Sequence, residues 1–217
     1  MRYLALVCVV AGSMAGARAA RAQDAPPIPR YVVDFHATVP MFPNDLLPLA
    51  DSRGVPHLTL TELPGWGFGA QAGAHLYLFR WKALTVGVGG EVMVARATST
   101  PPDSSLSTLR SVDERLVSAS PQLSFNFGSG HGWSYLSAGI GRSQWSLHPK
   151  SEPTGPADTE VLPTFNYGGG ARWFIKRHLA FSVDVRVYEV DPGSPFGTNP
   201  GSPRARVLTI GAGLSVK

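Results

Sequence analysis

The sequence predicts an all-β protein, an eight-stranded antiparallel transmembrane β-barrel with meander topology. Three observations lead to this fold class. Apolar and polar residues alternate along eight segments, the connections between the segments alternate between short and long, and aromatic residues gather near both ends of the segments. Alternation with a period of two is typical of a strand with two different faces, and strands joined by short connections pair as antiparallel hairpins.

The first 22 residues have the pattern of a secretory signal peptide. Arg2 gives a short basic region, residues 3–11 are apolar, and Ala20 and Ala22 are the small residues before the expected cleavage at Gln23. The apolar run is too short to cross the ~30 Å hydrocarbon core of a membrane. We therefore expect the chain to be exported and cleaved near Ala22.

After cleavage, residues 23–29 form a proline-rich lead-in, and residues 30–217 are expected to form the barrel. The signal contains three of the 19 basic residues and none of the 15 acids, so the mature net charge is 16 − 15 = +1. This balance gives no reason to expect a nucleic-acid partner. Cys8, the only cysteine, lies in the signal, so the mature chain has no disulfide or thiol chemistry.

The alternation is clearest in residues 179–190. There Leu179, Phe181 and Val183 share one face, and Asp184 and Arg186 share the other. We expect strands at about 30–39, 65–79, 83–97, 114–127, 133–147, 164–175, 179–190 and 204–216.

The connections between these segments fall into two groups. Three have the length of hairpin turns: 80–82, 128–132 and 176–178. Four are long: 40–64, 98–113, 148–163 and 191–203. Of the 19 prolines, 15 lie in the long connections, and only Pro121 lies within an expected strand. Proline cannot donate to a ladder and a closed barrel has no free edge, so we expect a bulge or a local break at Pro121.

The two faces of the strands predict which side meets lipid. One face is rich in valine, leucine and phenylalanine, and the other contains mainly glycine, serine and threonine with an occasional charge. A soluble barrel would fill its interior with bulky apolar side chains and expose lysine and glutamate. The small, polar face therefore suits the crowded interior of an eight-stranded barrel, and the valine-rich face is expected to meet lipid.

Aromatic placement supports the same orientation. Near the short-turn end lie Tyr31, Phe79, Trp81, Phe125, Phe127, Trp133, Tyr135, Trp173 and Phe174. Near the long-loop end lie Trp66, Phe68, Trp145, Phe165, Tyr167 and Tyr188. Two aromatic belts at opposite strand ends are typical of the two interfaces of a bilayer.

Three stretches support a family resemblance: GGGARWF (168–174), LAFSVDVRVYEV (179–190) and VLTIGAGLSV (207–216). With the signal, they make the chain resemble the small eight-stranded outer-membrane β-barrel proteins of Gram-negative bacteria, the porin-like superfamily around the transmembrane domain of outer-membrane protein A. The resemblance implies a monomer in the bacterial outer membrane. One departure is the end of the chain, Val216-Lys217, where such barrels commonly end in an aromatic residue that helps the insertion machinery.

Five charged residues are expected inside the barrel as a lumen-facing polar network: Asp34, Glu91, Arg172, Asp184 and Arg186. His36 and His75 are candidates to join them, and the parity of Arg142 does not decide its face. A charge in a narrow interior is costly unless it is paired. Such a network either closes the lumen with structural ion pairs or gates a thin pore.

The sequence gives little support to catalysis, and no cofactor or metal is expected. His148 lies near Ser146 and Glu152 in the third long connection, but the spacing matches no known nucleophile–base–acid pattern. The glycine-rich stretches lie within strands and are not followed by a helix, which excludes a phosphate loop. The histidines do not have the clustered spacing of metal ligands.

The expected function is therefore a structural or surface-interaction role, with outer-membrane lipid as one partner and an extracellular ligand bound through the loops 40–64, 98–113, 148–163 and 191–203. Two alternatives stay open. One is narrow-pore conduction of small solutes or ions. The other is a soluble, lipocalin-like carrier of an apolar ligand, which needs the opposite arrangement of faces.

Overall fold

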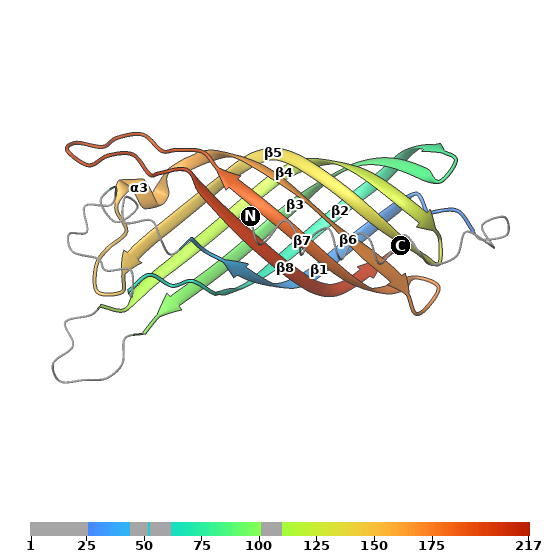
Figure 1. Ribbon diagram of the computed structural model, residues 1–217, viewed down its shortest axis with the longest axis horizontal. Coiled ribbons are helices and arrows are strands. Elements are labelled where there is room, and N and C mark those ends of the chain that lie inside the picture. Colours follow the sequence, from blue (N-terminus) through green and yellow to red (C-terminus); the bar gives the residue numbers. More distant parts are fainter. Residues whose placement is uncertain (1–25, 44–51, 53–61, 101–109) are drawn as a thin grey trace, which may run out of the picture.

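The computed structural model describes residues 26–43, 52, 62–100 and 110–217, so the expected signal peptide and most of the first long connection lie outside the described residues. The described part contains eight strands and a short helix (Figure 1). They are β1 (Tyr31–Met41), β2 (Phe68–Trp81), β3 (Leu84–Ser99), β4 (Val112–Ser129), β5 (Gly132–Pro149), α3 (Pro156–Thr159), β6 (Val161–Phe174), β7 (Leu179–Val190) and β8 (Ala205–Val216). No helix among these residues is long and apolar enough to cross a membrane.

Each strand pairs antiparallel with the next, and β8 pairs with β1, so the sheet closes with the predicted meander order. Following the paired positions once round the barrel from Tyr31 leads back to β1 at Met41, a stagger of 41 − 31 = 10 residues. This stagger tilts the strands, as Figure 1 shows. An eight-stranded barrel of this kind has an interior just wide enough for side chains.

The two ends of the barrel differ in their connections (Figure 1). At the short-turn end, tight turns join β2 to β3, β4 to β5 and β6 to β7. Pro26 accepts a backbone hydrogen bond from Gly130 and Lys217 donates one to His178, so both ends of the described chain lie at these turns. The other four connections and helix α3 lie at the long-loop end. The described arrangement therefore has the predicted alternation of short turns and long loops.

Several strands run further toward the long-loop end than predicted, which shortens the loops expected at 98–113 and 148–163. The structure places Pro40, Pro149 and Pro163 inside strands, so the prediction that only Pro121 lies in a strand was wrong. Each of these three prolines has a ladder partner on one side only: Thr209, Val112 and Arg142, respectively. A proline is tolerated there because its missing N–H is not needed by a second neighbour.

Pro121 does cause the local break that was predicted, without a bulge. Its ladder with β3 continues through the pair Gly90–Pro121. The ladder with β5 skips positions 120 and 121 and resumes in the same register at Gln122–Gly139. A bulge occurs instead in β2, between Tyr77 and Phe79. It turns Phe79 to the outer face at the short-turn end.

Apolar side chains cover the outside of the barrel. Phe35, Val92, Ile140 and Ile210 lie in the middle of strands, yet they are exposed by 57%, 54%, 73% and 45%, respectively. Their neighbours of opposite parity are buried in the interior. Bulky apolar side chains on the outer face suit lipid, which agrees with the orientation predicted from residues 179–190.

The pattern inverts near the long-loop ends of the strands. On β3 the outward residues change from Val92 and Val94 to Arg96, while the inward residues change from Glu91 to Met93. The same inversion places Arg115, Arg142 and Arg206 outward and Leu116, Trp145 and Val207 inward on β4, β5 and β8. The strand ends that extend from these four arginines toward the long loops are called the loop tier. The rest of the barrel is called the membrane tier.

The membrane tier has the length of a transmembrane barrel. Its outward face covers residues 84–94 of β3 and 117–127 of β4. A tilted strand needs ~9–11 residues to cross the hydrocarbon core. The loop tier has the pattern of a soluble barrel, with apolar side chains inside and polar side chains outside. The sequence-based expectation of a polar interior therefore holds for the middle of the membrane tier only.

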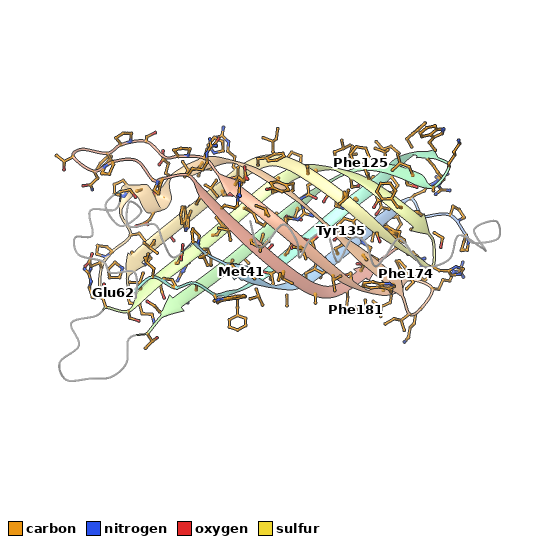
Figure 2. All side chains as sticks on the ribbon, in the orientation of Figure 1. Met41, Glu62, Phe125, Tyr135, Phe174 and Phe181 are labelled. Atoms are coloured by element: carbon orange, nitrogen blue, oxygen red, sulfur yellow. The ribbon has the colours of Figure 1, made fainter. Side chains whose placement is uncertain are left out.

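Five of the residues predicted to form the aromatic belts point into the barrel instead: Trp133, Tyr135, Trp145, Phe174 and Tyr188. That part of the prediction was wrong because it used distance from the strand end without parity. The other ten are exposed on the outer face, among them Trp81 and Phe125 at the short-turn end and Phe68 and Phe165 at the long-loop end. Figure 2 shows Phe125 and Phe181 near the short-turn end. Two outward belts therefore remain.

Candidate functional site

The candidate site is the set of polar side chains inside the membrane tier. At its short-turn side, Arg172 of β6 reaches across the interior to Asp34 of β1. The two form a bidentate pair, with Nε to Oδ1 at 2.8 Å and Nη2 to Oδ2 at 2.6 Å. Ser215 of β8 donates a third hydrogen bond to this carboxylate. The guanidinium of Arg172 lies 3.9 Å from the ring centre of Tyr135. Parallel hydrogen bonds of this kind are among the stronger polar contacts in proteins.

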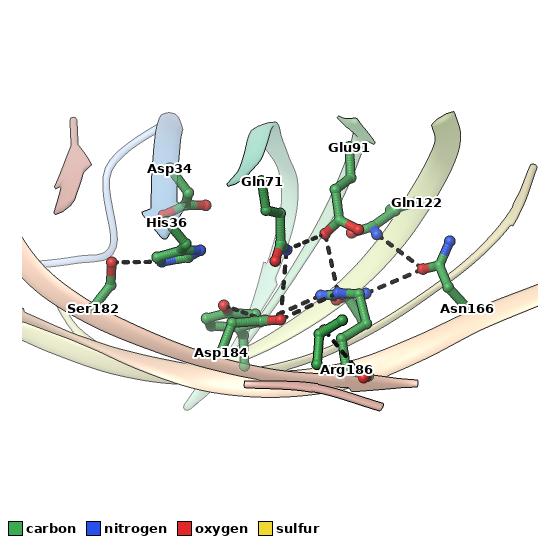
Figure 3. Close-up of polar contacts among 12 residues, drawn as sticks. Asp34, His36, Gln71, Glu91, Gln122, Asn166, Ser182, Asp184 and Arg186 are labelled. Carbon is green, nitrogen blue, oxygen red and sulfur yellow. Dashed lines mark hydrogen bonds and ion pairs between the residues drawn. The ribbon is translucent and has the colours of Figure 1, made fainter. Parts of the chain in front are cut away.

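Arg186 of β7 is the centre of the second part of the site (Figure 3). Its guanidinium forms ion pairs with Glu91 of β3 at 3.0 Å and with Asp184 of its own strand at 3.2 Å. It also donates to Asn166 at 3.1 Å and to Ser137 at 2.7 Å. All its contacts are buried, so one cation is held between two carboxylates in the middle of the barrel.

Neutral polar side chains bridge these charges. Gln71 of β2 donates to Glu91 at 2.6 Å and to Asp184 at 3.5 Å. Tyr188 donates to the other oxygen of Glu91 at 2.5 Å, and Tyr135 donates to Asp184 at 2.6 Å. Tyr135 therefore links the Arg172 pair to the Arg186 cluster.

The structure thus places all five predicted charges in the interior, where Asp34 pairs with Arg172 and Glu91 and Asp184 pair with Arg186. Sequence reasoning missed the neutral partners of the charges: Gln71, Ser137, Tyr135, Asn166, Tyr188 and Ser215. Their signal was present, because each has inward parity, but parity alone does not say which neutral residue meets which charge.

The two histidines also lie inside. The ring Nε2 of His36 is 2.8 Å from the hydroxyl of Ser182 (Figure 3). Both ring nitrogens of His75 are buried without a hydrogen-bond partner among the described residues. Neither histidine meets a second histidine or a carboxylate in a metal-binding group, since the described residues contain no cluster of metal-ligating side chains. Arg142, whose face the sequence left undecided, points outward.

Apolar and aromatic side chains fill the interior on both sides of the site. Toward the long loops lies a buried apolar cluster that includes Met93, Leu116, Trp145 and Val207. Toward the short turns, Trp133 packs between Tyr77 and Phe174 and contacts Ile28 and Val32.

The C-terminal residue covers this aromatic group. The ammonium of Lys217 lies 3.7 Å from the ring centre of Phe174 and donates to the backbone oxygen of Gly130. Partial burial lowers the pKa of Lys217 below its ordinary value. The lysine that replaces the expected terminal aromatic residue thus contacts aromatic rings itself.

The residues considered for catalysis do not form a catalytic set. Ser146 and His148 share a face of β5, and Asp113 lies opposite His148 in β4. The carboxylate of Asp113 is occupied by Arg96 and Thr98, and Nδ1 of His148 is buried without a partner among the described residues. Glu152 pairs instead with Arg110. The serine–base–acid chain that activates a nucleophile is therefore not assembled.

Comparison with known proteins finds a likeness of fold only. No family model matches the chain, and no curated protein matches its sequence. Among solved structures, Neisserial surface protein A is 14% identical, with 87% of this chain and 97% of that chain covered and a TM-score of 0.54.

Two other similar structures score lower. The attachment invasion locus protein Ail of Yersinia pestis is 12% identical, with 85% of this chain and 97% of that chain covered and a TM-score of 0.48. The outer membrane enzyme PagL is 11% identical, with 86% of this chain and 99% of that chain covered and a TM-score of 0.46. These two likenesses are too weak to bear on the function of this chain.

The closed eight-strand topology and the likeness of fold to Neisserial surface protein A define the class. The chain is a small eight-stranded transmembrane β-barrel of the outer-membrane type, which confirms the predicted fold and the resemblance. The fold itself does not decide between catalysis and other roles.

Proposed function

We propose that this protein is an outer-membrane barrel with a structural or surface-interaction role, and that its lumen does not conduct. The observation that carries this proposal is the polar network, to which side chains from all eight strands contribute. Arg186 pairs with Glu91 and Asp184 across the interior, and Gln71 donates to both carboxylates. An eight-stranded barrel leaves little room beside such side chains.

The loop tier supports the interaction role. A buried apolar cluster begins at the level of Met93, continues into the loop tier and packs the strand ends together, and loop residues join this packing through Phe42 and Leu63. Polar contacts between loops add to it, as when Glu160 accepts from the backbone N–H of Ser194 at 3.0 Å. Binding residues are disproportionately found on loops that a rigid scaffold positions. The long-loop end is therefore the surface we assign to an extracellular partner.

A planar-bilayer experiment tests the closed lumen. The barrel is folded into lipid vesicles, its folded state is checked by the change in gel mobility on boiling, and its conductance is recorded. We expect a heat-dependent shift and a current at the baseline of protein-free bilayers. Steady single-channel steps from heat-shifting protein would overturn the closed lumen and favour narrow-pore conduction. A protein that stays soluble and shows no shift would instead support the lipocalin-like alternative.

Cysteine labelling tests which end faces outward. Cys8 is the only cysteine and lies in the proposed signal peptide, so one introduced cysteine is unique in the mature chain. Lys150→Cys lies at the long-loop end and Lys82→Cys in a short turn, and both lysines are exposed. A membrane-impermeant maleimide should label Lys150→Cys on intact cells and Lys82→Cys only after the outer membrane is permeabilised. The reverse result would place the long loops in the periplasm.

A further inference from the structure

Three arginines lie together on the outside of the barrel, where the membrane tier meets the loop tier. Arg96 and Arg115 are direct partners across the β3–β4 ladder, and both are exposed. Arg142 is exposed on β5, opposite Ala119. Ala119 lies four residues along β4 from Arg115, which is about 13 Å at ~3.3 Å per residue. We name Arg96, Arg115 and Arg142 the arginine patch.

The patch has an unbalanced positive charge. Arg96 pairs with Asp113, with Nη2 to Oδ2 at 2.5 Å. No carboxylate of the described part of the chain forms an ion pair with Arg115 or Arg142. Like charges that face each other across an antiparallel pair are destabilising. Asp113 offsets this repulsion at Arg96 only, and an anion that binds Arg115 would reduce it further.

A shallow apolar depression lies on the lipid face over β1, β2 and β3, beside the Arg96 end of the patch. It has a volume of about 300 Å³, and Phe35, Ala70, Val92 and Val94 are among the residues that line it. Val94 is two residues from Arg96 on the same face of β3, so the depression ends at the patch.

A second depression of about 640 Å³ continues the first toward the middle of the membrane tier. It shares Phe35, Ala72 and Val92 with the first and extends to Ala119 and Pro121 of β4. Alanine and glycine side chains make this surface hollow because they are smaller than the valines and phenylalanines around it. The two depressions together are called the groove.

We propose that the arginine patch and the groove bind one phosphate-bearing membrane lipid, with the phosphate on the arginines and an acyl chain in the groove. Guanidinium groups bind phosphate through two parallel hydrogen bonds. Basic residues at the membrane surface recognise anionic lipid headgroups. The groove offers an apolar surface that an acyl chain can contact and that a free phosphate ion cannot. This inference goes beyond the proposed function and depends only on the membrane placement of the barrel.

Native mass spectrometry of the barrel in a neutral detergent tests the proposal. The probes are dimyristoyl phosphatidic acid, dimyristoyl glycerol, which has the same chains without phosphate, and inorganic phosphate. We expect saturable binding of one phosphatidic acid and no comparable binding of the other two probes. The double variant Arg115→Gln/Arg142→Gln should weaken phosphatidic acid binding by at least about tenfold, because it removes the two unpaired cations.

A matched control removes the same charge from the other side of the barrel. Arg204 and Arg206 are exposed beside β8 and already pair with Asp191 and Glu189, respectively. Arg204→Gln/Arg206→Gln should leave the affinity unchanged. Ala72→Leu, which fills the groove without changing charge, should weaken binding. The boiling-dependent gel shift shows that each variant is folded.

Three results would overturn the proposal. One is equal affinity of folded Arg115→Gln/Arg142→Gln and the β8 control. Another is equal binding of dimyristoyl glycerol, which would mean that the phosphate is not recognised. The third is competition by inorganic phosphate at the same concentration as the lipid, which would mean an anion site with no role for the groove.

Discussion

Removing the guanidinium of Arg186 should destabilise the barrel more than removing any outward arginine. Arg186 is 1% exposed and lies between Glu91 and Asp184, so Arg186→Gln leaves two buried carboxylates without their cation. Breaking a buried pair by removing one partner costs about 3–5 kcal/mol. With a typical urea dependence of about 1–3 kcal/mol per molar, the unfolding midpoint should fall by roughly 1–5 M.

The assay is urea unfolding of the folded barrel in neutral-detergent micelles, followed by tryptophan fluorescence. Arg142→Gln is the control, because Arg142 is exposed and should change stability by no more than ~0.5 kcal/mol.

The double variant Arg186→Gln/Glu91→Gln should recover part of the loss, because it removes one of the two orphaned charges. The charge-pairing argument is refuted if the unfolding free energy of Arg186→Gln lies within about 0.5 kcal/mol of that of the control. It is also refuted if the second substitution lowers the stability further.

Two other predictions test the two tiers. Val185→Arg puts a charge on the lipid face in the middle of β7 and should cost ~2–4 kcal/mol, seen as a smaller heat-shifting fraction after folding into vesicles, whereas Val185→Leu should fold like the wild type. An equal yield of Val185→Arg would mean that this face does not meet lipid. Trp145→Ala removes the largest buried side chain of the loop tier and should cost about 3–5 kcal/mol locally. Hydrogen exchange should therefore speed up at the long-loop ends of β4 and β5 and stay slow in the membrane tier, and faster exchange throughout would show that the tiers are not separate.

The sequence allowed the faces of the membrane tier to be predicted because parity is a local property. Asp184 and Val185 are adjacent, and once one faces the interior the other must face lipid. The same reasoning placed Glu91 and Arg172 inside. It failed for Trp145 and Tyr188, which were assigned to an outward belt from their distance to a strand end.

The partners within the interior could not be predicted, because they depend on the closed barrel. Asp34 and Arg172 lie 138 residues apart, and they meet only when β1 and β6 stand on opposite sides of one narrow lumen. The stagger that sets their heights is a property of all eight ladders together. The inversion at the loop tier was readable in β3, where Arg96 follows Val94 outward, but it required knowing that the strands continue beyond the lipid face.

The geometry of the network also bears on how the register of the barrel is fixed. A buried ion pair is weak evidence for net stability, because desolvation offsets most of the attraction. A slip of one residue in a ladder would turn the polar face to lipid. A slip of two would keep the faces but carry Asp34 away from Arg172 and Ser215, which come from β6 and β8. We therefore infer that these charges act mainly by making every other register costly, and that the first and last strands are aligned through their shared contacts with Asp34.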